Sequence, residues 1–204
     1  LSGGVDSTLV LALLRKVLPD IQVNAISIKF ANSVDETPFA AKIAQELDAE
    51  HHIIELGNYL SELPTAISII GMPFWDLHWY YVTKKAKTLS KYLLAGDGGD
   101  EVFGGYTFRY KKFLSLVKPN SSYKEKIQAY LQCHERDWVP DQTEVFGKKI
   151  RFSWDEMYRY LKPYFDNPLP PLAQVFLADF NGKLLYNWLP LYSQIHKHFA
   201  IKSL

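Results

Sequence analysis

Apolar residues recur at helical spacing directly after the Gly3-Gly4 turn. The segment Val23–Phe30 is short and rich in Val and Ile, which is typical of a strand. Pro38 lies near the start of a second helical pattern. The residues at helical spacing in the first pattern, which Pro19 ends, are Leu9, Val10, Leu13, Leu14 and Val17. The buried face of the second helix is expected to comprise Phe39, Ala40, Ile43, Ala44 and Leu47.

The alternation continues along the chain. Residues 52–56 predict a strand, the patterns at Leu63–Ile70 and 77–89 predict helices, and the short apolar run 92–95 fits one more strand. Strands that alternate with helices form βαβ units around a mostly parallel sheet. The predicted fold class is therefore α/β, with a doubly wound, mostly parallel sheet.

The second half of the chain has a different character. No strand is expected from Phe103 onward, aromatic residues are dense, and residues 172–199 predict one or two helices. The aromatic residues are interpreted as core rather than as a ligand platform. We therefore predict an α/β core over residues 1–112, and a helical, aromatic-rich extension of the same domain over residues 113–204.

Composition narrows the class of protein. The 204 residues are 48% hydrophobic and 22% charged, which excludes a disordered chain or a collagen-like repeat, and the net charge of +1 gives no argument for bulk binding to nucleic acid or membrane. Cys133 is the single cysteine, so no intrachain disulfide can form, which fits a reducing, cytoplasmic location. No run of about 18 apolar residues and no signal peptide is found. Because the chain opens at Leu1 directly before a turn, we expect a middle piece of a longer protein, truncated at both ends.

The first candidate motif is Ser-Gly-Gly-Val-Asp-Ser at residues 2–7. Two glycines allow a tight turn, the amide groups of such a turn point into its concavity, and a helix N-terminus adds partial positive charge. The alternative is a simple helix start capped by Asp6 or Ser7. With hydroxyls at Ser2 and Ser7 and a helix directly after them, we favour phosphate binding.

This motif differs from a Walker-type loop, which has wider glycine spacing and a Lys before its Ser/Thr. Here the residue before Ser7 is Asp6, and an acid beside a polyphosphate calls for a bridging cation such as Mg²⁺. The motif resembles the pyrophosphate-binding loop of the ATP pyrophosphatase superfamily. Members of that superfamily cleave ATP between its α and β phosphates and leave AMP on their substrate.

The second candidate motif spans residues 94–106, with five glycines and the carboxylates Asp97, Asp100 and Glu101. An acidic helix start would explain Glu101 well but Asp97 poorly. Carboxylates opposite a phosphate loop favour Mg²⁺ ligation by Asp100 and a catalytic acid–base or orienting role for Asp97.

The 94–106 segment resembles the Leu-Ser-Gly-Glu-Gly-Ser-Asp-Glu-Val/Leu-Phe-Gly-Gly-Tyr signature of the asparagine synthetase family. Asp35-Glu36 before a helix and the His51-His52 pair entering a strand also resemble that family, and the similarity covers residues 1 to about 110. In the family this is the synthetase half, usually preceded by a glutaminase domain. The resemblance implies an ATP-dependent ligase that adenylates the side-chain carboxylate of aspartate for attack by ammonia.

The resemblance also assigns residues. It implies that Asp6 and Asp100 share Mg²⁺ and that Asp97 is the catalytic residue. The pyrophosphate would be held by Ser2, Gly3, Gly4, Asp6 and Ser7, and the adenosine would be lined by Leu1, Ile28 and Gly96.

Several positions depart from the family pattern. Ala95 stands in place of Ser, Asp97 in place of Glu, and residues 77–81 are aromatic where asparagine synthetases carry small and polar substrate contacts. The alternatives are therefore an amide ligase for another carboxylate, similar to β-lactam synthetases, or a non-catalytic nucleotide-binding regulatory module. The basic clusters at 84–91 and 109–112 are interpreted as solvated faces, with tRNA contact as the alternative, and His196 and His198 are expected on a solvent-facing side of a helix.

Overall fold

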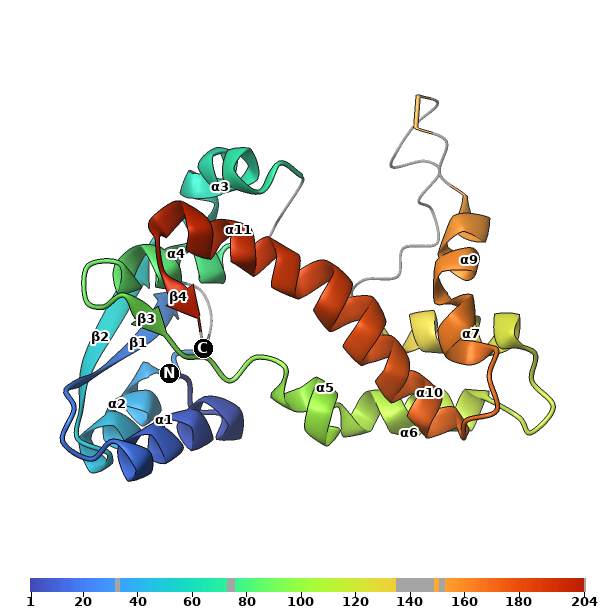
Figure 1. The fold of residues 1–204 in the computed structure, drawn as a ribbon, viewed down its shortest axis with the longest axis horizontal. Coiled ribbons are helices and arrows are strands. Elements are labelled where there is room, and N and C mark those ends of the chain that lie inside the picture. Colours follow the sequence, from blue (N-terminus) through green and yellow to red (C-terminus); the bar gives the residue numbers. More distant parts are fainter. Residues whose placement is uncertain (32–33, 73–75, 135–148, 151–152, 204) are drawn as a thin grey trace. The chain divides into compact units, whose positions relative to one another are not determined.

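The structure is a computed structural model that describes residues 1–31, 34–72, 76–134, 149–150 and 153–203 (Figure 1). The chain divides into two compact units. The first contains residues 1–97 and 188–204, and the second contains residues 98–187. The chain therefore passes between the units twice, at Asp97-Gly98 and at Asn187-Trp188.

The first unit is built on a parallel βαβ arrangement. Strand β1 (Val23–Phe30) pairs in parallel with β2 (Ala49–Leu56), in a register that runs from Val23 opposite Ala49 to Phe30 opposite Leu56. Helix α1 (Val5–Val17) precedes β1, and α2 (Thr37–Glu46) connects the two strands. Helices α2 and α4 (His78–Ala86) both pack on this pair of strands, and Figure 1 shows α2 on one side and α4 on the other.

The remainder of the first unit brings distant segments together. After β2 come η1 (Tyr59–Glu62), α3 (Leu63–Ile70), α4 and the two-residue strand β3 (Tyr92–Leu93). Helix α11 (Leu189–Phe199) packs against α3 and α4, and β4 (Lys202–Ser203) pairs in parallel with β3. The buried residues between these helices are Ala66, Leu77, Trp79, Tyr80, Tyr81, Tyr192 and Ile195.

The second unit is helical throughout its described residues. Its elements are α5 (Gly99–Phe103), α6 (Thr107–Leu116), α7 (Tyr123–Cys133), α9 (Trp154–Phe165), α10 (Pro171–Leu177) and the π-helical segment η2 (Ala178–Trp188), whose last residue is already counted with the first unit. A capping box between Ser122 and Glu125 fixes the start of α7.

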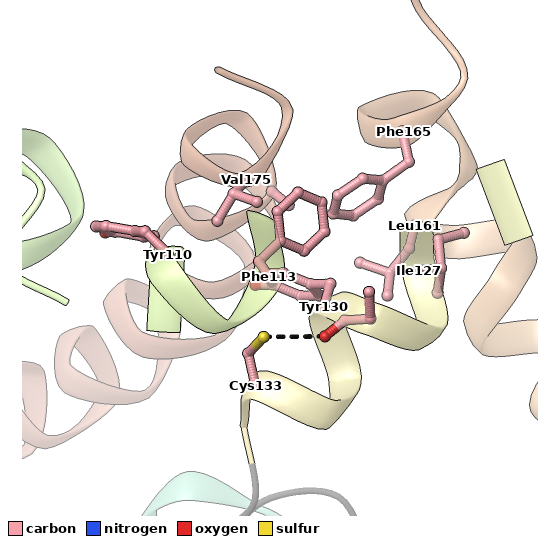
Figure 2. Close-up of a cluster of buried hydrophobic side chains, with 10 residues drawn as sticks. Tyr110, Phe113, Ile127, Tyr130, Cys133, Leu161, Phe165 and Val175 are labelled. Atoms are coloured by element: carbon pink, nitrogen blue, oxygen red, sulfur yellow. Dashed lines mark hydrogen bonds between the residues drawn. The ribbon is translucent and has the colours of Figure 1, made fainter. Parts of the chain in front are cut away.

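Aromatic and aliphatic side chains fill the core of the second unit. Figure 2 shows the rings of Phe113, Phe165 and Tyr130 packed together with Ile127, Leu161 and Val175. Cys133 is buried at the end of α7, where its Sγ donates to the carbonyl oxygen of Ala129 at 3.0 Å. The prediction that the aromatic residues of this half are core is therefore confirmed for Tyr110, Phe113, Tyr130 and Phe165. It is wrong for Phe103, Phe108 and Tyr160, which are exposed, while Trp138 and Phe152 lie outside the described residues.

The predicted alternation of helices and strands is confirmed, and so is the α/β class. The described strands form two parallel pairs, β1 with β2 and β3 with β4, so a doubly wound sheet is not what this part of the chain shows. The expectation of no strand after Phe103 is wrong at β4. Phe39, expected on the buried face of its helix, is 58% exposed, and its ring lies beside Gly3. The predicted boundary at residue 112, between the α/β core and the helical extension, stays a prediction.

Within the described residues, no helix combines the length and apolar character needed to cross a membrane.

Candidate functional site

The serine and glycine residues at the start of the chain form a closed turn before α1. Ser2 Oγ accepts from the Gly4 amide at 3.1 Å and lies 2.9 Å from Ser7 Oγ, which itself accepts from the Ser2 amide at 3.1 Å. Gly4 is the N-cap residue in an extended conformation, and no side chain of the described residues caps the helix. Asp6 and Ser7 lie inside α1, so the alternative in which one of them is the N-cap is wrong. Because the first amide groups of a helix have no acceptor within it, this turn presents donors suited to an anion.

The turn is anchored to both central strands. The Leu1 nitrogen donates to the carbonyl oxygen of Ile26, and the Ser27 hydroxyl donates to the carbonyl oxygen of Leu1 at 2.5 Å. Ser27 Oγ also lies 2.7 Å from Nε2 of His51, and since the Ser27 proton is used on Leu1, the imidazole is the donor. Burial lowers the pKa of His51. A neutral His51 on β2 thus orients the serine that holds the loop.

Gly96 brings the second motif to the first. A side-chain carbon at Gly96 would lie 2.7 Å from both the carbonyl carbon of Asp6 and the amide nitrogen of Ser7. No residue larger than glycine fits this approach without displacing the start of α1. The structure therefore places the 94–97 segment directly against the predicted pyrophosphate loop, as a common site requires.

Asp97 follows Gly96 and lies near Leu1, the residue that precedes the serine and glycine turn. Asp97 and Ala95 also line a cavity of about 560 Å³ within the first unit. The other lining residues are Trp79, Leu93, Leu189, Tyr192, Ser193, His196, Lys197, Ile201 and Ser203. The predicted catalytic carboxylate is thus at the edge of a space large enough for a small molecule.

His196 is one of the buried walls of that cavity. It is only 7% exposed, so its expected position on a solvent-facing side of the helix is wrong. On α11, His196 lies one turn after Tyr192, and this spacing puts both on the face that packs on α4.

The remaining carboxylates of the 94–106 motif belong to the second unit. Asp100 lies in the first turn of α5, and its carbonyl oxygen accepts from the amides of Gly104 and Gly105 at 2.9 and 3.0 Å. A side-chain carbon at Gly105 would lie 1.7 Å from Asp100 Oδ1 and 3.1 Å from the Asp100 Cα, so the Asp100 carboxylate would have to move. The motif's glycines therefore shape the backbone around Asp100.

Glu101 has a structural role that the sequence did not reveal. Its side chain is 1% exposed and accepts from Lys183 Nζ at 3.0 Å and from the Tyr106 hydroxyl at 2.9 Å. Lys183 lies on η2, 82 residues further along the chain, so no local pattern could have indicated it. Burial and the negative charge of Glu101 raise the pKa of Tyr106, which keeps this hydroxyl a proton donor.

The two carboxylates predicted to share Mg²⁺ lie in different units, Asp6 in the first and Asp100 in the second. In the described part of the chain, no group of three His, Cys, Asp or Glu side chains is placed to hold a metal. Mg²⁺ usually takes one or two protein carboxylates, with phosphate oxygens and waters as its other ligands. Asp6, in the first turn of α1 beside the loop amides, fits that donor set. The shared site stays a prediction, as does the adenosine contact of Ile28, which lies on β1 opposite Ile54.

Known proteins with similar sequences point to one family. The asparagine synthase family profile matches residues 1–199. A putative glutamine-hydrolyzing asparagine synthetase 2 of Methanocaldococcus jannaschii is 35% identical over 111 residues, covering 52% of this chain and 22% of that protein. The glutamine-hydrolyzing asparagine synthetase 1 of Bacillus subtilis is 31% identical over 57% of this chain and 19% of its own length, and the enzyme of Bos taurus is 29% identical over 54% and 22%.

The match to these relatives is partial in both directions. The chain spans about a fifth of the length of the curated relatives that it matches. No solved structure matches the chain. The family profile nevertheless covers nearly all of the sequence, including both glycine-rich motifs, and the chain therefore belongs to the asparagine synthase family.

Proposed function

We propose that this chain is the ATP-binding part of a ligase that converts a carboxylate into an amide. The single observation that carries the proposal is the close approach of Gly96 to Asp6 and Ser7, which brings residues 94–97 of the second motif against the first motif within one unit. One motif presents donors for an anion, and the other presents a carboxylate at the edge of a cavity. The family membership supports this combination.

The chemistry explains why both parts are needed. A carboxylate is a poor electrophile, because direct attack by ammonia would have to expel oxide. If a carboxylate oxygen attacks the α-phosphorus of ATP, the bond to the β-phosphate oxygen breaks, pyrophosphate leaves, and an acyl-adenylate forms. Ammonia then attacks the acyl carbon, loses a proton, and expels AMP to give the amide. Groups that hold the departing pyrophosphate stabilise the charge that develops in the first step.

Each of the predicted site residues has a proposed role in this reaction. Ser2, Gly3, Gly4, Asp6 and Ser7 hold the pyrophosphate, and Leu1, Ile28 and Gly96 line the adenosine. Asp97 accepts the proton from the attacking ammonia, which its place at the cavity edge supports. Mg²⁺ held by Asp6 and Asp100 would neutralise phosphate charge when bound.

The substrates follow from the family. We propose aspartate or another carboxylate as the acid, and ammonia released by a glutaminase domain or subunit as the nitrogen source. The relatives that carry "glutamine-hydrolyzing" in their names support the second point. A cytoplasmic location, which the single cysteine favours, stays a prediction.

The test is ATP–pyrophosphate exchange catalysed by the full-length parent protein with Mg²⁺, with and without aspartate and with a panel of other carboxylates. Exchange that depends on a carboxylate is expected, and Asp97→Ala should abolish amide formation while ATP affinity is kept. Asp20→Ala, in the exposed turn after α1, is the matched control and should retain activity. Absence of exchange with every acid, despite measurable ATP binding, would overturn the proposal in favour of a regulatory module.

A further inference from the structure

The cavity beside Asp97 has an apolar and aromatic wall. Trp79, Tyr192 and His196 line it and are 5%, 6% and 7% exposed. Four aliphatic residues complete the apolar part, namely Leu93, Ala95, Leu189 and Ile201. Only Asp97 and Lys197 among the lining residues carry formal charges at neutral pH. Such a lining suits a ligand with an apolar body and few charges.

The aromatic residues that line the cavity come from two helices of the first unit. The Trp79 ring on α4 lies 4.4 Å from the Tyr192 ring on α11, measured between centroids. The Trp79 and His196 rings meet edge to face, with centroids 5.8 Å apart and an interplanar angle of 75°. Burial lowers the pKa of His196, so this part of the wall is neutral at neutral pH. The cavity therefore presents the faces and edges of aromatic rings to a ligand, and His196 adds no positive charge to it.

Trp79 is distinct from the two aromatic residues that follow it. The Tyr80 hydroxyl donates to Glu62 Oε2 at 2.8 Å, and the Tyr81 hydroxyl donates to the carbonyl oxygen of Tyr59 at 2.9 Å. Both tyrosines thus have structural partners in the fold, and neither lines the cavity. Of the three consecutive aromatic residues 79–81, Trp79 is the one placed to contact a ligand beside Asp97.

We infer that this cavity binds the body of the carboxylate substrate, and that Trp79 selects an acid whose body is apolar or aromatic in preference to aspartate. This inference rests on the proposed adenylation. Aspartate carries an amino group and a second carboxylate besides the reacting one, and each loses water when it is buried. A monocarboxylic acid with an apolar body loses little hydration apart from its reacting group, and its body gains contact with the rings. The reacting carboxylate would then lie toward Asp97.

The test uses the full-length parent protein, with 3-phenylpropanoate and aspartate as probes. Binding is measured by equilibrium dialysis, and adenylation by ATP–pyrophosphate exchange. We expect 3-phenylpropanoate to bind more tightly than aspartate, and Trp79→Ala to weaken its binding by about tenfold or more with ATP affinity unchanged. Trp79→Phe keeps a ring in the wall and should lose less. ATP affinity is measured on every variant, so a variant that fails to fold is recognised by its loss of ATP binding. If Trp79→Ala fails to fold, the test is made with Trp79→Phe.

The outcomes separate this inference from the proposed function. Trp79-dependent binding of 3-phenylpropanoate, with exchange supported by that acid, is the expected result. Binding that depends on Trp79 without exchange by any acid keeps the cavity assignment and overturns the adenylation. Exchange supported by aspartate, with no binding of 3-phenylpropanoate, overturns the inference and leaves the proposed function intact. Equal loss of aspartate and 3-phenylpropanoate binding in Trp79→Ala also overturns it, since Trp79 would then not select between them.

Discussion

The turn at residues 2–7 and the cluster of Glu101, Tyr106 and Lys183 are both rich in polar groups, yet they differ in burial and in partners. The serines of the turn are bonded mainly to one another and to the turn's own backbone, at partly open positions. Glu101 is almost fully buried and is bonded to a cation and a hydroxyl from other elements. The comparison teaches that polar residues in the two motifs have different roles. Exposed groups can exchange their partners for a ligand, whereas a buried charge depends on the partner that it has.

The largest expected effect is on the buried cluster. Lys183→Met would leave the Glu101 carboxylate buried without its cation, which should cost about 3–5 kcal/mol of unfolding free energy. Denaturant unfolding of the full-length protein measures this loss. The control is Arg159→Met, which removes an exposed ion pair with Glu156 and should cost less than about 1 kcal/mol. Equal losses in the two variants would erase the distinction between the buried cluster and the surface.

The next effect concerns the close approach of Gly96 to the turn before α1. Gly96→Ala places a carbon 2.7 Å from the backbone of Asp6 and Ser7, so the start of α1 must shift, at a cost of about 1–3 kcal/mol of stability. We expect ATP affinity to fall by at least about tenfold, since the donors of the turn move with it. Isothermal titration calorimetry with ATP measures this change. Gly57→Ala, where a side-chain carbon meets no atom within 4 Å, is the matched control. Unchanged ATP affinity in Gly96→Ala would mean that the two motifs do not form one site.

A smaller effect is expected for the hydroxyl that closes the turn. Ser7→Ala removes the acceptor for the Ser2 amide and the partner of Ser2 Oγ, and we expect ATP binding to weaken by about 0.5–1.5 kcal/mol. Unfolding free energy should change little, because the turn is partly open to solvent. Ser115→Ala, which removes a hydroxyl from the exposed side of α6, should alter neither quantity. A loss of stability larger than the loss of ATP binding would show that the turn behaves like the buried cluster.

The smallest effect concerns pH and the aromatic wall. Burial lowers the pKa of His196 below its ordinary value of 6.5, so the unfolded chain binds this proton more readily than the folded one. Its contribution to stability is therefore full above about pH 6.5 and decreases as the pH falls toward the folded-state pKa. His196→Phe should make the denaturant midpoint less dependent on pH between 7.5 and 5.5. His198→Phe adds the same ring at an exposed position of α11 and is the control. An unaltered pH dependence in His196→Phe would contradict the burial of a neutral imidazole.

The sequence was sufficient wherever structure is set by neighbours along the chain. Residues Val23–Phe30 and Leu63–Ile70 form their predicted strand and helix because composition and periodicity act locally. Strand β4 was missed because it has only two residues, and its partner β3 lies about 110 residues earlier in the chain. Helical spacing predicted that Phe39 is buried, but spacing alone does not show which other segments cover a side chain. The ring of Phe39 lies beside Gly3 in the turn before α1 and remains largely exposed.

The candidate site divides in the same way. The serines and glycines of the turn could be named in advance, because their chemistry is contained within six consecutive residues. The roles of Lys183 and His51 could not be predicted in advance, because each acts on a partner that only the fold brings close. His196 was misplaced because its charged neighbours along the chain suggested solvent, whereas its neighbour one turn earlier, Tyr192, decides which way it faces.

The attachment of Leu1 to β1 has a thermodynamic consequence for ligand binding. The nitrogen and the carbonyl oxygen of Leu1 are both bonded to consecutive residues of the strand, and Ser27 is held in turn by His51. The conformational entropy of this end of the turn is therefore lost when the sheet forms, before any ligand binds. Association with a phosphate then requires little further ordering, which is the condition under which a few modest hydrogen bonds suffice for useful affinity.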